Sequence, residues 1–159
     1  MKRSVITTSD GSMSIQMDEW GETYHSVHGA VQEANHVYIE QGLHRMTTDD
    51  FAVLEMGFGT GLNCFLTIKE VLTQGKKIHY DAIEAYPIQQ EELAVLNYGS
   101  FFQQENLQHI YSALHEVTWG ETHEIIPGFT LRKYCNTFEK QVLPNSFYDL
   151  VYFDVFGYP

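Results

Sequence analysis

Three glycines, Gly57, Gly59 and Gly61, stand at alternate positions between two apolar runs in residues 51–65, FAVLEMGFGTGLNCF. Glycine tolerates positive φ and has no Cβ, so this spacing predicts a tight turn that another group approaches closely. The run before the turn is typical of a buried strand, and the run after it has helical periodicity as far as Gly75. A strand, a glycine loop and a helix would direct backbone N–H groups and the positive end of a helix dipole toward a ligand. We therefore expect the loop to bind a small molecule.

Two acidic residues frame this loop. Glu55 lies two residues before Gly57, where it could accept a hydrogen bond from an amine or support the loop through water. Glu84 ends the next expected strand, a position from which a carboxylate can bind both hydroxyls of a ribose. The G-x-G-x-G spacing differs from the G-x-G-x-x-G of dinucleotide-binding enzymes, and Glu55 would repel a pyrophosphate, so NAD is the weaker alternative. The pattern favours a nucleoside that carries an amino acid, such as S-adenosylmethionine.

Two further polar residues follow later strands. Asn136 comes directly after the third expected strand, where its amide could bond the edge of an adenine or could cap a short helix. Asp154 ends the very apolar run LVYF, at the same edge of the sheet as the glycine loop. A carboxylate is costly to bury there without a task or a partner, so we interpret Asp154 as a functional residue.

The elements that must position these residues alternate between strand and helix. An N-terminal hairpin is expected around Asp10-Gly11, and a helix over 26–43 that Ser26 would cap and Gly42 would end. Further strands are expected over 51–56, 77–84, 128–135 and 147–156, with helices over 62–74, 87–98, 106–114 and 137–142.

This alternation predicts an α/β fold: a doubly wound, mainly parallel Rossmann-like sheet with helices on both faces. One domain over residues 1–159 is expected, with the hairpin and helix in 1–45 and the cofactor-binding core in 51–159. The sequence ends just beyond a strand that should be central, so we expect a form truncated after the fourth strand. Sheet surface exposed in this way would favour a homodimer.

Composition and charge narrow the classes of partner. With 9 Lys and Arg against 21 Asp and Glu, the net charge is minus 12, which disfavours binding of nucleic acid through phosphates alone. The two cysteines and eight histidines show no metal-ligand spacing, so no metal is expected. No apolar run has the length of a signal peptide or a membrane span, which predicts a cytoplasmic protein.

Four segments of the sequence together resemble a known family. From about Glu22 onward, the chain is similar to the methyltransferase domain of the MnmC family, which completes 5-methylaminomethyl-2-thiouridine at the tRNA wobble position. The segments that carry the resemblance are ETYHSVHGAVQEANHVYIEQGL, EMGFGTGLNCF, YDAIEAYP and DLVYFDVFGYP.

The resemblance implies an S-adenosylmethionine-dependent N-methyltransferase with tRNA as its substrate. It implies that Glu84 binds the ribose of the cofactor and that Asp154 accepts the proton of the acceptor amine. It also implies that a polar cluster lines the uridine pocket, namely Tyr24, His25 and Ser26. Its cofactor loop comprises Glu55, Gly57, Phe58, Gly59, Thr60, Gly61, Leu62 and Asn63. Because no basic stripe is evident, methylation of a small amine is one alternative. Because the chain is expected to be truncated, a cofactor-binding module without catalysis is another.

Overall fold

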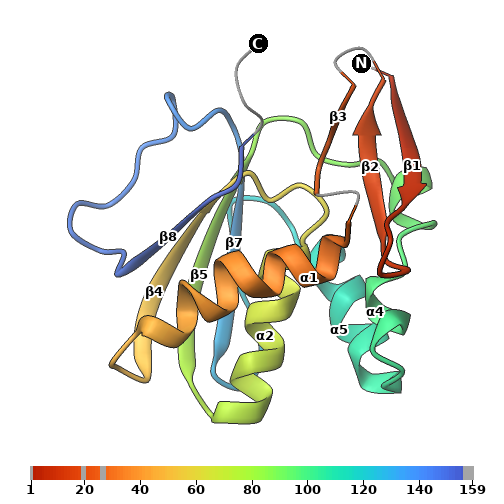
Figure 1. The fold of residues 1–159 in the computed structure, drawn as a ribbon. Helices are drawn as coiled ribbons and strands as arrows, with labels where there is room; N and C mark the ends of the chain where they lie inside the picture. The colour runs from red at the N-terminus through yellow and green to blue at the C-terminus, as the bar shows by residue number, and fades with distance from the viewer. Residues whose placement is uncertain (1, 19–20, 26–27, 156–159) are drawn as a thin grey trace.

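The computed structural model describes residues 2–18, 21–25 and 28–155, which form two β-sheets and a group of helices (Figure 1). The smaller sheet is antiparallel, with the order β1 (Arg3–Thr7), β2 (Met13–Met17) and β3 (Glu22–Thr23). The connection between β1 and β2 is the loop of residues 8–12, longer than the two-residue turn expected at Asp10-Gly11. The larger sheet has five strands in the order β6-β7-β5-β4-β8.

The strand order of the larger sheet contains a switch point. The chain passes from β4 (Asp50–Met56) to β5 (Lys77–Glu84) and β7 (Phe129–Cys135), then returns to the other side of β4 as β8 (Leu150–Phe153). These four strands pair in parallel, while β6 (Thr122–Ile126) is an antiparallel edge strand that sequence reasoning missed. The sheet is therefore mixed, within the expected α/β class. Ligands of such sheets bind where the strand order reverses, which here lies between β4 and β8.

The longer helices lie on one face of this sheet (Figure 1). The helical elements of the described chain are α1 (Ala30–Ala34), the π-helix η1 (Asn35–Glu40), the 3-10 helix η2 (Leu43–Arg45), α2 (Leu62–Gln74), α3 (Gln90–Leu93), α4 (Tyr98–Phe101) and α5 (Glu105–Glu116). On this face Lys133 of β7 donates to the Leu114 carbonyl of α5 at 2.7 Å, and the rings of Tyr80 and Tyr152 pack into the core. None of the helices in the described ranges is long and apolar enough to cross a membrane.

The opposite face carries a connection without a helix. Tyr148 contacts Asp81 through its hydroxyl, and the ring of Phe147 packs edge-on against His79, so the end of the connection over residues 136–149 lies on this face. The expectation of helices on both faces is therefore wrong for the described chain, and the helix expected over 137–142 is only a turn. Its two apolar residues, Phe138 and Val142, are both exposed, and a short helix without a packed face is not stable.

Two other expected helices differ in extent. The helix expected over 26–43 begins as α1 at Ala30 and continues as the π-helix, and Ser26 lies outside the described residues. The helix expected over 87–98 breaks into α3 and α4, with Gly99 inside α4. Asn97 explains the break, because its side chain accepts from the Met13 N–H at 2.9 Å and donates to the Gly11 carbonyl at 3.0 Å.

The N-terminus of α1 is capped by a loop that is remote in the sequence. In the loop of residues 8–12, the side chains of Thr8, Ser12 and Asp10 accept hydrogen bonds from the first three N–H groups of α1. Such acceptors satisfy N–H groups that a helix itself leaves unpaired. Burial opposes the charge of Asp10, but the hydrogen bonds from Ser12 and Thr8 outweigh it and lower the Asp10 pKa. The small sheet is thereby tied to the first helix.

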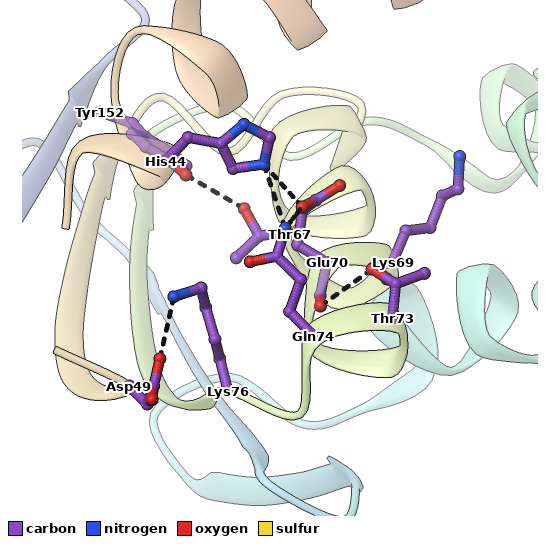
Figure 2. A network of polar contacts seen from close by, with 9 residues as sticks. All are labelled: His44, Asp49, Thr67, Lys69, Glu70, Thr73, Gln74, Lys76 and Tyr152. Carbon is purple, nitrogen blue, oxygen red and sulfur yellow. Dashed lines mark hydrogen bonds and ion pairs between the residues drawn. The ribbon is translucent and has the colours of Figure 1, made fainter. Parts of the chain in front are cut away.

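Polar contacts hold helix α2 both on the side that faces away from the sheet, called here the outer side, and on the side that faces the sheet, called the inner side (Figure 2). His44 Nε2 lies 2.7 Å from Glu70 Oε2, and Gln74 contacts the same carboxylate. On the inner side, Thr67 Oγ1 lies 3.3 Å from the hydroxyl of Tyr152 in β8. These contacts join α2 to η2 and to the edge strand of the sheet.

The glycine loop between β4 and α2 is approached closely, as expected, but by the protein itself. A Cβ at Gly57, where φ is 93°, would lie 1.9 Å from the carbonyl oxygen of Asp154. A Cβ at Gly59, where φ is 50°, would lie 3.0 Å from the ring of Tyr24, and one at Gly61 would meet the ring of Phe58 at 3.0 Å. The glycines are thus required by the packing of the loop, whatever ligand it binds.

Removal of the Asp10 cap should destabilise the fold in a pH-dependent way. We expect Asp10→Ala to lower the free energy of unfolding by about 1–2 kcal/mol at neutral pH. Because the pKa of folded Asp10 is lowered, its contribution is present above the unfolded pKa and is lost as the pH falls below about 4. Urea denaturation at neutral and acidic pH measures both effects. Asp18→Ala is the control, since Asp18 binds Ser4 on the surface; equal losses would contradict the capping role.

Substitution at Gly57 should be far more costly than at another glycine of positive φ. We expect Gly57→Ala to cost more than about 3 kcal/mol, because the carbonyl of Asp154 is backbone and cannot rotate away. Gly75→Ala is the matched control: its φ is 70°, no atom lies within 4 Å of the added Cβ, and the cost should be about 1–2 kcal/mol. Urea denaturation of both variants compares them, and a similar cost would show that the contact with Asp154 is unimportant.

Candidate functional site

The carboxyl ends of the parallel strands bring the main predicted residues to one edge of the sheet. Met56 pairs with Ile83 and with Phe153, so the residues that follow them, Gly57, Glu84 and Asp154, stand on adjacent strands at the switch point. The Asp154 N–H donates to the Met56 carbonyl at 2.9 Å, which continues the pairing of β8 with β4 by one residue. The order of the strands therefore assembles the site that the sequence predicted in separate pieces.

Glu84 is bound to the glycine loop. Its Oε2 accepts from the Gly59 N–H at 2.8 Å, and its Oε1 accepts from the Tyr86 N–H at 2.8 Å. A carboxylate oxygen can accept more than one hydrogen bond, and Glu84 is partly exposed, so both oxygens can still bind hydroxyl groups of a ligand. These properties fit the role that was predicted for Glu84.

Three other N–H groups of the loop are used within the protein. Those of Gly57 and Phe58 donate to the Ile83 carbonyl at 3.0 and 3.1 Å, and that of Gly61 donates to the Phe58 carbonyl at 2.8 Å. With the Gly59 N–H on Glu84, these four groups do not form the cradle that binds phosphate in dinucleotide-binding loops. The arrangement weighs against a pyrophosphate ligand and so against NAD.

Asn63, in the first turn of α2, bridges two carboxylates. Its Nδ2 donates to Glu55 Oε1 at 3.0 Å and to Asp154 Oδ2 at 2.7 Å. Glu55 is 0% exposed and its second oxygen accepts from the Tyr80 hydroxyl at 2.9 Å. Glu55 thus lies behind the site and holds Asn63, while Asp154, partly buried, lies at the edge of the sheet.

Burial and charge act together on these two acids. Burial, and then the neighbouring charge of Asp154, raises the pKa of Glu55 well above its usual range, against hydrogen bonds from Tyr80 and Asn63. Burial also raises the pKa of Asp154, while hydrogen bonds from Asn63 and Tyr38 lower it and the charges of Glu33 and Glu84 raise it. Both acids therefore hold a proton more readily than exposed carboxyl groups do, so the pKa of Asp154 lies above that of an ordinary aspartate.

Tyr38 is a member of the site that sequence reasoning missed. It falls within the helix expected over 26–43, and the π-helix places its hydroxyl 3.4 Å from the Phe153 carbonyl, where it also acts on Asp154. π-Helical turns occur often at functional sites. Nothing in the sequence of η1 distinguishes this winding from an α-helix.

The residues of the polar cluster before the first helix, Tyr24, His25 and Ser26, have different surroundings where the structure describes them. The ring of Tyr24 covers Gly59, and burial, opposed by Arg3 and aided by Glu84, raises the pKa of Tyr24 to about 12. His25 is buried, with Nδ1 3.1 Å from Ser14 Oγ, and burial lowers its pKa to about 4. Ser26 lies outside the described residues. Of these three, Tyr24 is the residue that the structure places beside the loop.

The remaining predicted residues have local roles. Asn136 accepts from the Thr137 N–H at 2.9 Å, and its own N–H donates to the Glu84 carbonyl at 3.1 Å, so its amide forms a turn next to Glu84. Phe58 and Thr60 are buried, and the Thr60 carbonyl accepts from the Tyr111 hydroxyl at 2.8 Å. They support the loop, and an adenine contact of Asn136 stays a prediction.

A pocket of about 150 Å³ adjoins Gly59 on the helix side. Lys133, which the sequence did not single out, lies at its base and is 1% exposed. Burial lowers the pKa of Lys133 to about 8, and the Leu114 and His115 carbonyls bind its ammonium group. Lys133 therefore closes the end of α5, since cations favour the carboxyl ends of helices.

Within residues 2–18, 21–25 and 28–155, no group of three or more His, Cys, Asp or Glu side chains is placed to hold a metal ion. Cys64 is buried and Cys135 is exposed, and both are free. At the edge strand, Val151 and Phe153 are 50% and 61% exposed, and the homodimer remains a prediction.

Known proteins resemble the chain in sequence over part of their length. No protein-family model matches it. The tRNA 5-methylaminomethyl-2-thiouridine biosynthesis bifunctional protein MnmC of Thiobacillus denitrificans is 32% identical over 116 residues, which cover 69% of this chain and 18% of that protein. The protein of the same name from Leptospira borgpetersenii is 32% identical over 85 residues, covering 48% of this chain and 13% of that protein.

The fold is shared with a solved relative. The crystal structure of MnmC2 from Aquifex aeolicus matches with a TM-score of 0.77 at 20% identity, over 98% of this chain and 50% of that one. The chain thus spans half the length of this structure and less than a fifth of the curated relatives. By its sequence and its fold, the chain is a homologue of part of the MnmC proteins.

Proposed function

We propose that the chain is an S-adenosylmethionine-dependent N-methyltransferase that acts in the cytoplasm on the aminomethyl group of a modified wobble uridine in tRNA. The observation that carries the proposal is the position of Asp154, a partly buried carboxylate at the switch point, bonded to Asn63 and close to the glycine loop and Glu84. The name of the relatives, tRNA 5-methylaminomethyl-2-thiouridine biosynthesis protein, supports the substrate class. In this proposal residues 1–159 are one domain, with the cofactor-binding core in 51–159.

The residues at the edge of the sheet fit such a cofactor. Glu84 would accept hydrogen bonds from the ribose hydroxyls, next to Gly59 and the ring of Tyr24. Asn136, which adjoins Glu84 through its backbone, would lie beside the adenine. Bound S-adenosylmethionine supplies an electrophilic methyl group. Four further residues would maintain the shape of the loop, namely Glu55, Phe58, Thr60 and Gly61. The first three of them are buried.

Asp154 would act on the proton of the acceptor. An alkylammonium has no free electron pair and cannot attack a methyl carbon until it loses a proton, which a carboxylate in a partly buried site can accept. The raised pKa of Asp154, caused mainly by burial, makes it a better proton acceptor than an exposed aspartate. The larger part of the acceleration would come from holding the amine and the methyl group in line.

Methylation of a small amine is a second candidate, favoured by the distribution of charge. Among the described residues, five of the nine basic side chains form ion pairs with acids: Lys2, Arg3, Lys76, Lys77 and Arg132. A sixth, Lys133, is buried. A small amine needs no cationic surface, whereas tRNA binding depends on contacts with phosphates.

Cofactor binding is the first test. Calorimetric titration should give micromolar affinity for S-adenosylmethionine and no binding of NAD. We expect Glu84→Gln to weaken binding by about 10- to 100-fold, since each hydrogen bond to a charged group contributes about 1.5–3 kcal/mol. Glu70→Gln on the outer side of α2 is the control and should bind like the unmodified chain (Figure 2). Absence of binding by a folded sample would reject the proposal.

Methyl transfer to tRNA that carries an aminomethyl uridine tests the role of Asp154. Asp154→Asn should lower kcat by about 10²- to 10⁴-fold with little effect on cofactor affinity. The rate of the unmodified chain should fall as the pH drops through the raised pKa of Asp154, because only the carboxylate accepts a proton. Undiminished activity of the variant would refute the role. Transfer to free methylamine-type acceptors, independent of salt, would favour the second candidate.

A further inference from the structure

Among the described residues, Asn63 is the side chain that hydrogen-bonds both Glu55, a fully buried acid, and Asp154, the proposed proton acceptor. Both hydrogens of its amide are used, one on Glu55 Oε1 at 3.0 Å and one on Asp154 Oδ2 at 2.7 Å. The residue is 2% exposed, so no hydrogen of the amide remains for a ligand. The cofactor contact that the resemblance implies for Asn63 stays a prediction.

The orientation of the amide is fixed by its two partners. If oxygen and nitrogen exchanged places, the amide oxygen would face Asp154 Oδ2, and the donation to this carboxylate would be lost. The observed orientation leaves Asn63 Oδ1 buried without a hydrogen-bond partner within the described part of the chain. An unpaired buried acceptor costs free energy, so the double donation to Glu55 and Asp154 must outweigh that cost.

The surroundings of Asp154 make this donation important. Burial disfavours the ionised form of Asp154, and Glu33 of α1 and Glu84 of β5 also place negative charge near it. The donors that favour the ionised form are the Asn63 amide and the hydroxyl of Tyr38 in η1. Asn63 provides a hydrogen bond of 2.7 Å from a position that the first turn of α2 fixes.

We propose that Asn63 is a positioning residue, anchored by Glu55, that keeps Asp154 ionised and in one orientation for the methyl transfer proposed above. The inference rests on that function. Glu55 serves in it as the fixed support of the amide, since it is held in turn by Tyr80. A buried acid that reaches no ligand thereby contributes to the site through one hydrogen bond.

The proposal is tested by the pKa of Asp154 in the ligand-free chain. The pKa is measured from the ¹³C shift of the side-chain carboxyl, which Asp154→Asn assigns. Because Asn63 stabilises the carboxylate, Asn63→Ala should raise the pKa by about one pH unit or more. Thr67→Val is the matched control: Thr67 Oγ1 donates to the Asn63 carbonyl at 2.8 Å, one turn along α2, and its loss should leave the pKa unchanged. An unchanged pKa in folded Asn63→Ala overturns the proposal.

A second measurement tests the hydrogen bond between Asn63 and Asp154 without a substitution at Asn63, and it applies even if Asn63→Ala does not fold. In the unmodified chain, the side-chain amide protons of Asn63 should shift with pH at the same midpoint as the carboxyl carbon of Asp154. Amide protons that do not respond to that titration would show that the bridge to Asp154 is absent in solution, and would overturn the proposal.

Kinetics separate this inference from the proposed function. In an active chain, Asn63→Ala should move the acidic limb of kcat/KM upward by the same shift as the Asp154 pKa, with the Kd for S-adenosylmethionine within about twofold. Loss of cofactor affinity with an unmoved limb would make Asn63 a cofactor ligand and overturn the inference. An inactive parent chain that still shows the pKa shift would instead reject the methyltransferase function and retain the bridge.

Discussion

The contact between Gly57 and the backbone of Asp154 determines how the carboxyl ends of β4 and β8 meet. The Asp154 carbonyl occupies the place that a Cβ of Gly57 would take, while its N–H donates to the Met56 carbonyl. At this separation the side chain of Asp154 reaches Asn63 in the first turn of α2. The loop, the helix and the edge strand are therefore mutually dependent, and none of them can move without displacing the carboxylate.

Two buried acids on opposite faces of the sheet show how their surroundings decide the charge of a carboxyl group. Asp81 on the open face is buried, but hydrogen bonds from His79, Arg132 and Tyr148 outweigh burial and lower its pKa. Glu55 on the helix face has only neutral donors, and burial with the charge of Asp154 raises its pKa. Asp81 thus anchors Tyr148, near the end of the connection over residues 136–149, whereas Glu55 supports Asn63 on the helix face.

The strands and the long helices could be predicted from the sequence because their apolar residues follow simple periods. β4, β5 and β7 match the expected runs, as does α2 with Gly75 at its end. The start of α1 could not be predicted, because its caps come from the loop of residues 8–12. The break at Asn97 likewise depends on a contact with β2, which is distant in sequence.

The candidate site was predictable in its location but only partly in its contacts. Glu84 and Asp154 follow apolar strands, and parallel strands bring such residues to one edge. The sequence does not reveal that Asp154 lies against Gly57 and Tyr24 against Gly59, while the approach of a ligand to the loop stays a prediction. Tyr38 and the bridging role of Asn63 depend on a π-helical turn and on tertiary contacts.

The place of β8 in the chain has a consequence for the order in which the site can form. Ala52 of β4 and Asp149, directly before β8, are bonded to each other although they lie 97 residues apart. Closing so long a loop costs more chain entropy than the pairing of β4 with β5, which are joined by α2 alone. Docking of β8 is therefore expected late in folding. The carboxylate of Asp154 arrives with this strand, so the site is completed only after the rest of the sheet has formed.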